Sequence, residues 1–123
     1  MNIEELRNLC LSLKATDESF PFDDKTLVFK VMNKMFILCS LESNPLRFNF
    51  KALPEDGIAY RESYPAVIPG YHSDKKHWNT VSLDGSVPTE ILEKFILDSY
   101  NLVVSSLPKY KQKELREDDT QYS

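Results

Sequence analysis

The residue types that could do chemistry gather between residues 69 and 81. This stretch holds both histidines, the only tryptophan and an adjacent pair of lysines. Histidine changes charge near neutral pH, indole and phenol rings can stack on bases, and lysine pairs with phosphate. The candidate site residues here are Tyr71, Lys75, Lys76, His77 and Trp78. They suggest either a centre built on the histidines or a surface that binds a polyanion.

The histidines lack the partners that a metal or catalytic centre needs. His72 and His77 are five residues apart, which matches neither the i, i+4 spacing nor the Cys-x-x-Cys spacing of recognisable zinc sites. Ser73 could pair with His77, but no glycine-rich or elbow sequence supports a nucleophile there. Cys10 and Cys39 lie in apolar runs and are expected to be buried free thiols. We predict no metal, no cofactor and no enzymatic activity.

The charge is distributed unevenly along the chain. The formal net charge is −4, which does not attract nucleic acid as a whole. Between residues 27 and 53, however, four cations stand against Glu42 alone and leave +3. Two of them, Lys30 and Arg47, are expected on strand faces opposite the apolar residues, so they join the candidate set. The alternative is that these cations are only solvated and that Trp78 only packs.

The first half of the chain predicts one helix and a hairpin. Leu6, Leu9 and Leu13 recur at helical spacing, which predicts a helix over residues 3–13 with Asn2 as its cap. Residues 15–25 are expected to be a loop with aromatic anchors. Residues 27–32 and 35–41 predict two strands around an Asn33-Lys34 turn. The expected core face carries five apolar residues: Leu27, Phe29, Val31, Phe36 and Leu38.

The second half predicts further strands and a long helix. Residues 46–50 alternate strictly and predict a strand, and residues 54–63 favour a short helix that begins at Pro54. Residues 66–68 predict a short edge strand, and residues 76–83 predict the last strand. Trp78 and Val81 are expected on opposite faces of this last strand unless a bulge intervenes. From Pro88 an apolar stripe of about five turns predicts the longest helix. The domain is expected to span residues 1–109, followed by a charged, mobile tail over residues 110–123.

These elements predict an α+β two-layer sandwich. An antiparallel sheet of about five strands would carry the N- and C-terminal helices on one face. The start of the chain is acidic where a signal peptide would be basic, and no apolar run is long enough to span a bilayer. We therefore expect a cytoplasmic protein with no membrane contact.

Several strings in the chain are distinctive together. They are Glu62-Ser63-Tyr64-Pro65, Pro69-Gly70-Tyr71-His72, Lys75-Lys76-His77-Trp78-Asn79-Thr80-Val81, Asp98-Ser99-Tyr100 and Leu107-Pro108-Lys109. With them the chain resembles the MmcQ/YjbR family from the first helix to Lys109. The resemblance implies a CyaY-like, or frataxin-like, fold and a DNA-binding role through a double-wing arrangement of strands and loops. It brings no catalytic residues.

Two binding functions remain open from the sequence, and a third, enzymatic function would require both histidines and an acid to converge in one cleft. The first is a small DNA-binding protein in which Lys30, Arg47, Lys75 and Lys76 contact phosphates beside Tyr71, His77 and Trp78. The second is a module that binds a protein or small ligand without nucleic acid and without catalysis. They differ in whether the cations converge on one face.

Overall fold

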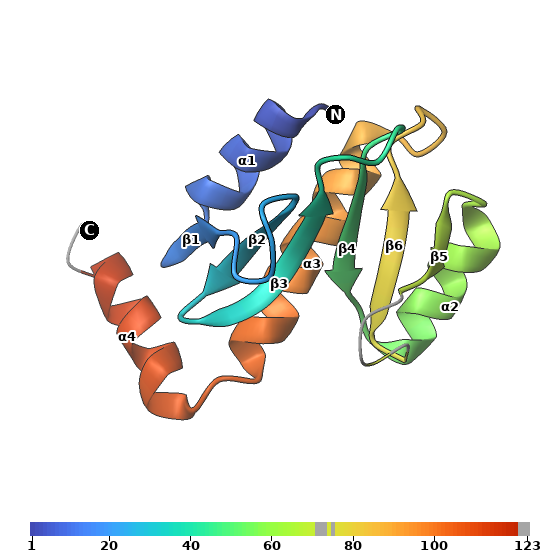
Figure 1. Ribbon diagram of the computed structural model, residues 1–123. Coiled ribbons are helices and arrows are strands. Elements are labelled where there is room, and N and C mark those ends of the chain that lie inside the picture. Colours follow the sequence, from blue (N-terminus) through green and yellow to red (C-terminus); the bar gives the residue numbers. More distant parts are fainter. Residues whose placement is uncertain (71–73, 75, 121–123) are drawn as a thin grey trace.

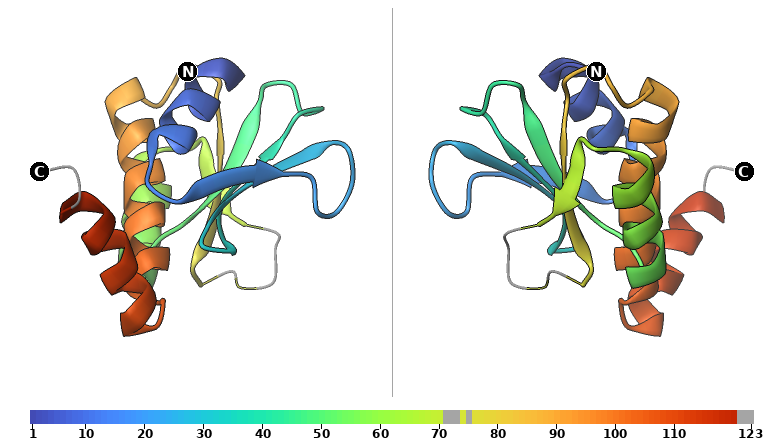
Figure 2. Two further views of the ribbon diagram at one scale, coloured as in Figure 1. Left: turned by 90° about the vertical axis from the view of Figure 1, so that its left-hand side faces the viewer. Right: turned by 90° about the vertical axis from the view of Figure 1, so that its right-hand side faces the viewer.

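One antiparallel sheet of six strands carries all the helices on one side. The computed structural model describes residues 1–70, 74 and 76–120, with side chains as far as residue 116. The strands are β1 (Thr16–Ser19), β2 (Thr26–Val31), β3 (Lys34–Ser40), β4 (Arg47–Lys51), β5 (Val67–Pro69) and β6 (Trp78–Ser82), in the order β1-β2-β3-β4-β6-β5. The helices are α1 (Ile3–Ser12), α2 (Pro54–Ser63), α3 (Thr89–Ser105) and α4 (Lys109–Thr120). Figures 1 and 2 show the two layers, which confirm the predicted α+β sandwich with six strands instead of about five.

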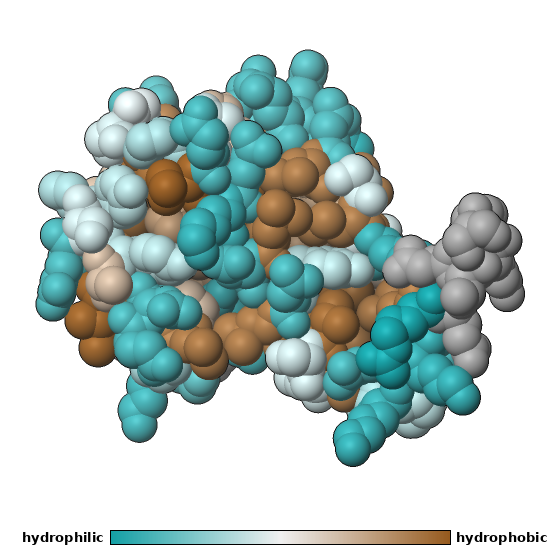
Figure 3. Space-filling model, turned by 180° about the vertical axis from the view of Figure 1, so that it is seen from behind, coloured by the Kyte–Doolittle hydropathy of each residue, from teal (hydrophilic) through white to brown (hydrophobic). Residues whose placement is uncertain are grey.

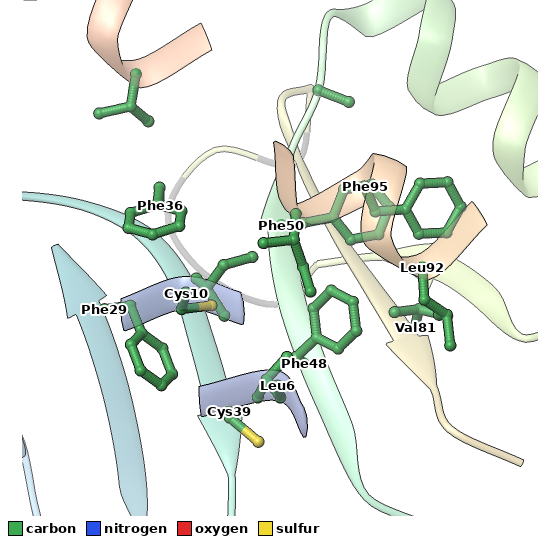
Figure 4. Packing of buried hydrophobic residues seen from close by; sticks show 14 of the residues in the cluster. Leu6, Cys10, Phe29, Phe36, Cys39, Phe48, Phe50, Val81, Leu92 and Phe95 are labelled. Atoms are coloured by element: carbon green, nitrogen blue, oxygen red, sulfur yellow. The ribbon is translucent and has the colours of Figure 1, made fainter. Parts of the chain in front are cut away.

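The core fills the space between the sheet and the helices (Figure 4). Phenylalanines from three strands, Phe29, Phe36, Phe48 and Phe50, are fully buried there with Leu6 and Cys10 of α1. The Phe50 ring stacks on Phe95 of α3 with centroids 4.4 Å apart. Full burial of side chains of this size stabilises the fold by about 1.5–3 kcal/mol each.

Both terminal helices of the predicted sandwich have the expected apolar stripes. In α1 the Asn2 side chain accepts from the Glu5 amide and the Glu5 carboxylate accepts from the Asn2 amide, so the predicted capping box is present. In α3 the buried residues follow the helical period: Leu92, Phe95, Ile96, Ser99 and Val103. These stripes fix which side of each helix faces the sheet.

The loop predicted over residues 15–25 contains a strand. Strand β1 pairs antiparallel with β2, with Thr16 opposite Val31. The strand was missed because an edge strand can be polar throughout, and here Glu18 binds Arg7 of α1 through a bidentate ion pair instead of burying an apolar side chain. The aromatic anchors expected in this loop were also wrong, since the side chains of Phe20 and Phe22 are exposed.

The hairpin is present, but its turn and its faces differ from the prediction. The two turn residues are Met32 and Asn33, both with positive φ, and Val31 pairs with Lys34. The register shifts between Phe29 and Lys30 at a β-bulge. As a result Ile37 and Cys39 face the core and Leu38 faces away from it, the reverse of the expected alternation.

The last strand is shorter than predicted and the tail contains a helix. Lys76 and His77 lie in a turn before β6. Helix α4 occupies most of the segment predicted as a mobile tail. Leu115 is buried, and the Gln112 side chain donates to the Leu107 carbonyl, so a single apolar residue and a few polar contacts attach α4. The domain boundary after residue 109 stays a prediction.

Candidate nucleic-acid interface

The side of the sheet that faces away from the helices is called here the open face. Register and strand alternation assign side chains to it, because neighbours of core residues point the other way. Arg47 and Lys51 flank Phe48 and Phe50 on β4, and Lys30 follows Phe29 on β2. Phe29, Phe48 and Phe50 all belong to the core cluster, so the three cations share the open face.

The three cations are available to a ligand. Arg47 is exposed and Lys30 and Lys51 are partly exposed. None of them forms an ion pair with any residue that the structure describes. Lys30 and Lys51 lie on strands two places apart, a separation of about 10 Å, and Arg47 is four residues from Lys51, about 13 Å along the strand. Asp17 lies opposite Lys30 on β1 and offsets part of this charge.

Trp78 packs on the open face and does not project from it. It lies opposite Lys51 in the β4–β6 register and forms a small apolar cluster with Val28 and Leu38. Only 8% of Trp78 is exposed. Trp78 and Val81 are on opposite faces, as predicted, since Val81 belongs to the main core. The indole is therefore mostly buried among apolar side chains of the open face, and it offers little area on which a base could stack.

The turn before β6 holds the remaining candidates that can be placed. His77 Nδ1 lies 2.5 Å from Asp74 Oδ2, and this hydrogen bond lowers the pKa of the Asp74 carboxyl. The Lys76 amide donates to the same carboxylate, and the Lys76 residue is exposed. Tyr71 and Lys75 lie outside the described residues, as do His72 and Ser73. The Asp74–His77 hydrogen bond can be explained as a contact that stabilises this turn, and it requires no catalytic role.

Other residues of the distinctive strings have structural partners. Buried Asn79 accepts from Arg61 at 2.5 Å and donates to the His77 carbonyl. Gly70 donates to the Trp78 carbonyl, and a Cβ at Gly70 would lie 3.0 Å from the Trp78 backbone. These residues of the distinctive strings therefore have a structural role, because their contacts hold α2, β5 and β6 together.

The described residues contain no cluster of metal-binding side chains, and both cysteines are buried. Within them, no group of three His, Cys, Asp or Glu side chains could hold a metal ion. Burial raises the pKa of both Cys10 and Cys39 to about 12, so both thiols stay protonated in the core. Across the same part of the chain, no helix is long and apolar enough to cross a bilayer.

The helix side differs from the open face in the apolar surface that it exposes. Figure 3 shows apolar surface gathered there between hydrophilic side chains, and exposed apolar residues on that side include Leu11 and Leu97. A groove of about 330 Å³ lies between the start of α2 and α3, with Leu53 and Leu102 beside Asp56 and Asp98. Asp98 already binds Lys94 and accepts from the Tyr60 hydroxyl.

Two residue sets escaped the sequence-based candidate list. Lys51 is one of the four cations between residues 27 and 53 and was considered with Lys30 and Arg47 as a basic sheet surface, but it was left out of the candidate set. Strict alternation with Phe50 places it on the same face as Arg47. Phe20 and Phe22 are 48% and 62% exposed. Their signal is an aromatic-proline-aromatic string in an otherwise polar loop.

The fold and the open face define a small α+β protein with one antiparallel sheet, helices on one side and cations on the other. Residues 11–102 match the family model described as YjbR. The chain is 35% identical over 113 residues to the uncharacterized protein YbdF of Escherichia coli O157:H7, covering 92% of this chain and 93% of that protein. It is 32% identical over 115 residues to the uncharacterized protein YjbR of Escherichia coli strain K12, covering 94% and 98%.

Solved structures agree with this assignment. The crystal structure of Deinococcus radiodurans protein DR2400, of domain DUF419, is similar with a TM-score of 0.87 and 44% identity, covering 93% of this chain and 87% of that chain. A Pseudomonas syringae protein shares the fold with a TM-score of 0.71 at 22% identity, over 83% and 98% of the two chains. The chain belongs to the YjbR family, as its sequence strings indicated.

Proposed function

We propose that the protein binds DNA through the open face and catalyses no reaction. The observation that supports the proposal is that Lys30, Arg47 and Lys51 share the sheet face that no described helix covers, and that they form no ion pairs with described residues. Duplex DNA presents one negative charge per about 1.7 Å, so cations about 10–13 Å apart can contact several phosphates at once. Lys76 at the neighbouring turn is a candidate for a fourth contact, and Lys75, which lies outside the described residues, stays a candidate from the sequence alone.

The test is a titration of labelled DNA at several salt concentrations. Each phosphate contact contributes about 0.7–0.9 to the slope of log K against log salt. Replacing Lys30, Arg47 and Lys51 together by Gln should therefore reduce the slope by about 2 to 3. Lys109→Gln on α4, on the helix side, is the matched control and should leave the slope unchanged. Absence of salt-sensitive binding at micromolar protein contradicts the proposal.

The second candidate is a module for a protein or a small ligand. The groove between α2 and α3 favours it, because apolar Leu53 and Leu102 lie there beside the Asp56 carboxylate, which forms no ion pair with a described residue. Such a groove suits a cationic group on an apolar stem. NMR shift mapping with a basic peptide discriminates the candidates: changes at Leu53 and Leu102 favour the groove, and changes at Lys30 and Lys51 on adding DNA favour the open face.

A further inference from the structure

The open face carries a hollow beside Arg47. It has a volume of about 390 Å³ and is lined by Arg47, Pro65, Ala66, Ile68, Ser82, Asp84 and Ser86. This volume falls in the range of small-ligand sites. Pro65, Ala66 and Ile68 supply an apolar wall, and the Arg47 guanidinium is the cation of the site. A planar ring with polar edges matches this combination of an apolar wall and a cation.

The polar groups of the hollow are largely held in place. The Asp84 carboxylate accepts from the Ser86 amide at 2.9 Å and from the Ser86 hydroxyl at 2.6 Å, and these bonds lower the pKa of Asp84. Arg47 makes no ion pair with Asp84 or with any other described residue. A guanidinium without a fixed carboxylate can stack on a base or pair with a phosphate.

Two exposed aromatic side chains belong to a loop at the β1–β2 edge of the sheet. Phe20 and Phe22 belong to the β1–β2 loop, which projects away from the helices beyond the sheet (Figure 2). The loop is held at its exit, because Asp23 accepts from the amides of Lys25 and Thr26. Exposed aromatics beside cations are the recurring elements of sites for single-stranded nucleic acid.

The sheet register connects these two features. Thr26, where the loop enters β2, is opposite Ser40 on β3, which is opposite Arg47 on β4, which is opposite Ser82 on β6. The loop, Arg47 and the hollow therefore follow one another across the strands. From β2 to β6 this row spans about 15 Å at the usual strand spacing.

We infer that the preferred ligand of the open face is single-stranded nucleic acid, with an unpaired base in the hollow beside Arg47 and bases stacked on Phe20 and Phe22. This inference rests on the proposed function. A base inside a duplex is paired and stacked, so it cannot enter the hollow or cover an aromatic ring without being extruded. A single strand offers its bases freely, and its phosphates reach Arg47 and Lys51.

The test compares fluorescence anisotropy of one labelled 12-nucleotide DNA strand, the same strand in RNA, and its DNA duplex. We expect a single strand to bind at least tenfold tighter than the duplex at physiological salt. Replacing both Phe20 and Phe22 by Ala should weaken single-strand binding about tenfold or more, because base stacking on aromatics is lost. Tyr110→Ala is the control, since Tyr110 is 63% exposed on α4.

Arg47→Lys separates the hollow from the general charge. Lysine keeps the charge but lacks the planar group, so single-strand affinity should fall several-fold while duplex affinity and the salt slope stay unchanged. Equal or tighter binding of the duplex overturns the inference and leaves the proposed function in place. Absence of salt-sensitive binding to any of the three probes overturns both. Unchanged single-strand binding by both variants, with unchanged thermal midpoints, also overturns the inference.

Discussion

The hydroxyl of Ser99 lies 2.6 Å from the carbonyl oxygen of Phe36, to which it donates, and it accepts from the Lys51 amide at 2.8 Å. Ser99 is on α3, and the two backbone groups belong to β3 and β4. The bulge near Phe36 interrupts the regular register at this end of the sheet. A helix side chain thus supplies the hydrogen bonds at the end of the β3–β4 pair and sets the backbone position of Lys51 on the open face.

Ser99→Ala should lower the free energy of unfolding by about 1–3 kcal/mol, because it leaves a backbone donor and acceptor without their partner. Urea denaturation followed by circular dichroism measures the change. Ser105→Ala is the matched control, since Ser105 donates to the Leu102 carbonyl from an exposed position on the same helix. It should change stability by less than about 0.5 kcal/mol. Equal effects of the two variants would show that the bridge contributes nothing.

Arg61 and Asn79 should be energetically coupled. The Arg61 guanidinium donates to the fully buried Asn79 amide oxygen, and this bond joins α2 to β6. Hydrogen bonds to charged groups contribute about 1.5–3 kcal/mol, so a double-mutant cycle with Arg61→Ala and Asn79→Ala should give a coupling energy in that range. A cycle pairing Arg61→Ala with Asn101→Ala on α3 should be additive within about 0.5 kcal/mol.

The two cysteines should resist thiol reagents in the native state. Burial raises the pKa of Cys10 and Cys39 to about 12, so at pH 8 roughly one thiol in ten thousand is ionised. Ellman's reagent at pH 8 should release no colour from the folded protein within minutes, and it should report both thiols in denaturing urea. Rapid reaction of the native protein would show that the layer between α1 and the sheet opens easily.

Stability should decrease in acid partly through Glu18. Its hydrogen bonds from Arg7 lower its pKa in the folded state. The unfolded chain therefore takes up the proton first, and the contribution of Glu18 is present above the ordinary glutamate pKa of about 4.3 and is lost as the pH falls through the lower folded pKa. Glu18→Gln should lower the urea midpoint at pH 7, and its difference from the parent should disappear at acidic pH.

Glu93→Gln on α3 is the control for this pH series, because Glu93 has no ion pair with any described residue. Its midpoint should follow that of the parent at every pH. A constant offset of Glu18→Gln from pH 7 down to pH 2 would contradict a role for the Glu18 charge, and would assign the loss to packing instead.

The sequence by itself determined the elements whose pattern repeats locally. The period of α3, the alternation of β4 and the capping box of α1 each depend on neighbours a few residues away. These patterns were sufficient for the α+β class and for the separate faces of Trp78 and Val81. The distinctive strings indicated the YjbR family, which the comparisons confirm.

Only the tertiary structure decided the features that depend on distant partners. The bulge reversed the faces on which Ile37, Leu38 and Cys39 lie. Strand β1 formed because β2 and Arg7 lie beside it. Helix α4 packs near Lys14, whose ammonium donates to the Leu115 carbonyl. The same holds for the site: Lys30 and Arg47 are 17 positions apart in the sequence. They share the open face because strand pairing through β3 fixes the register, and pairing between distant segments leaves no local pattern.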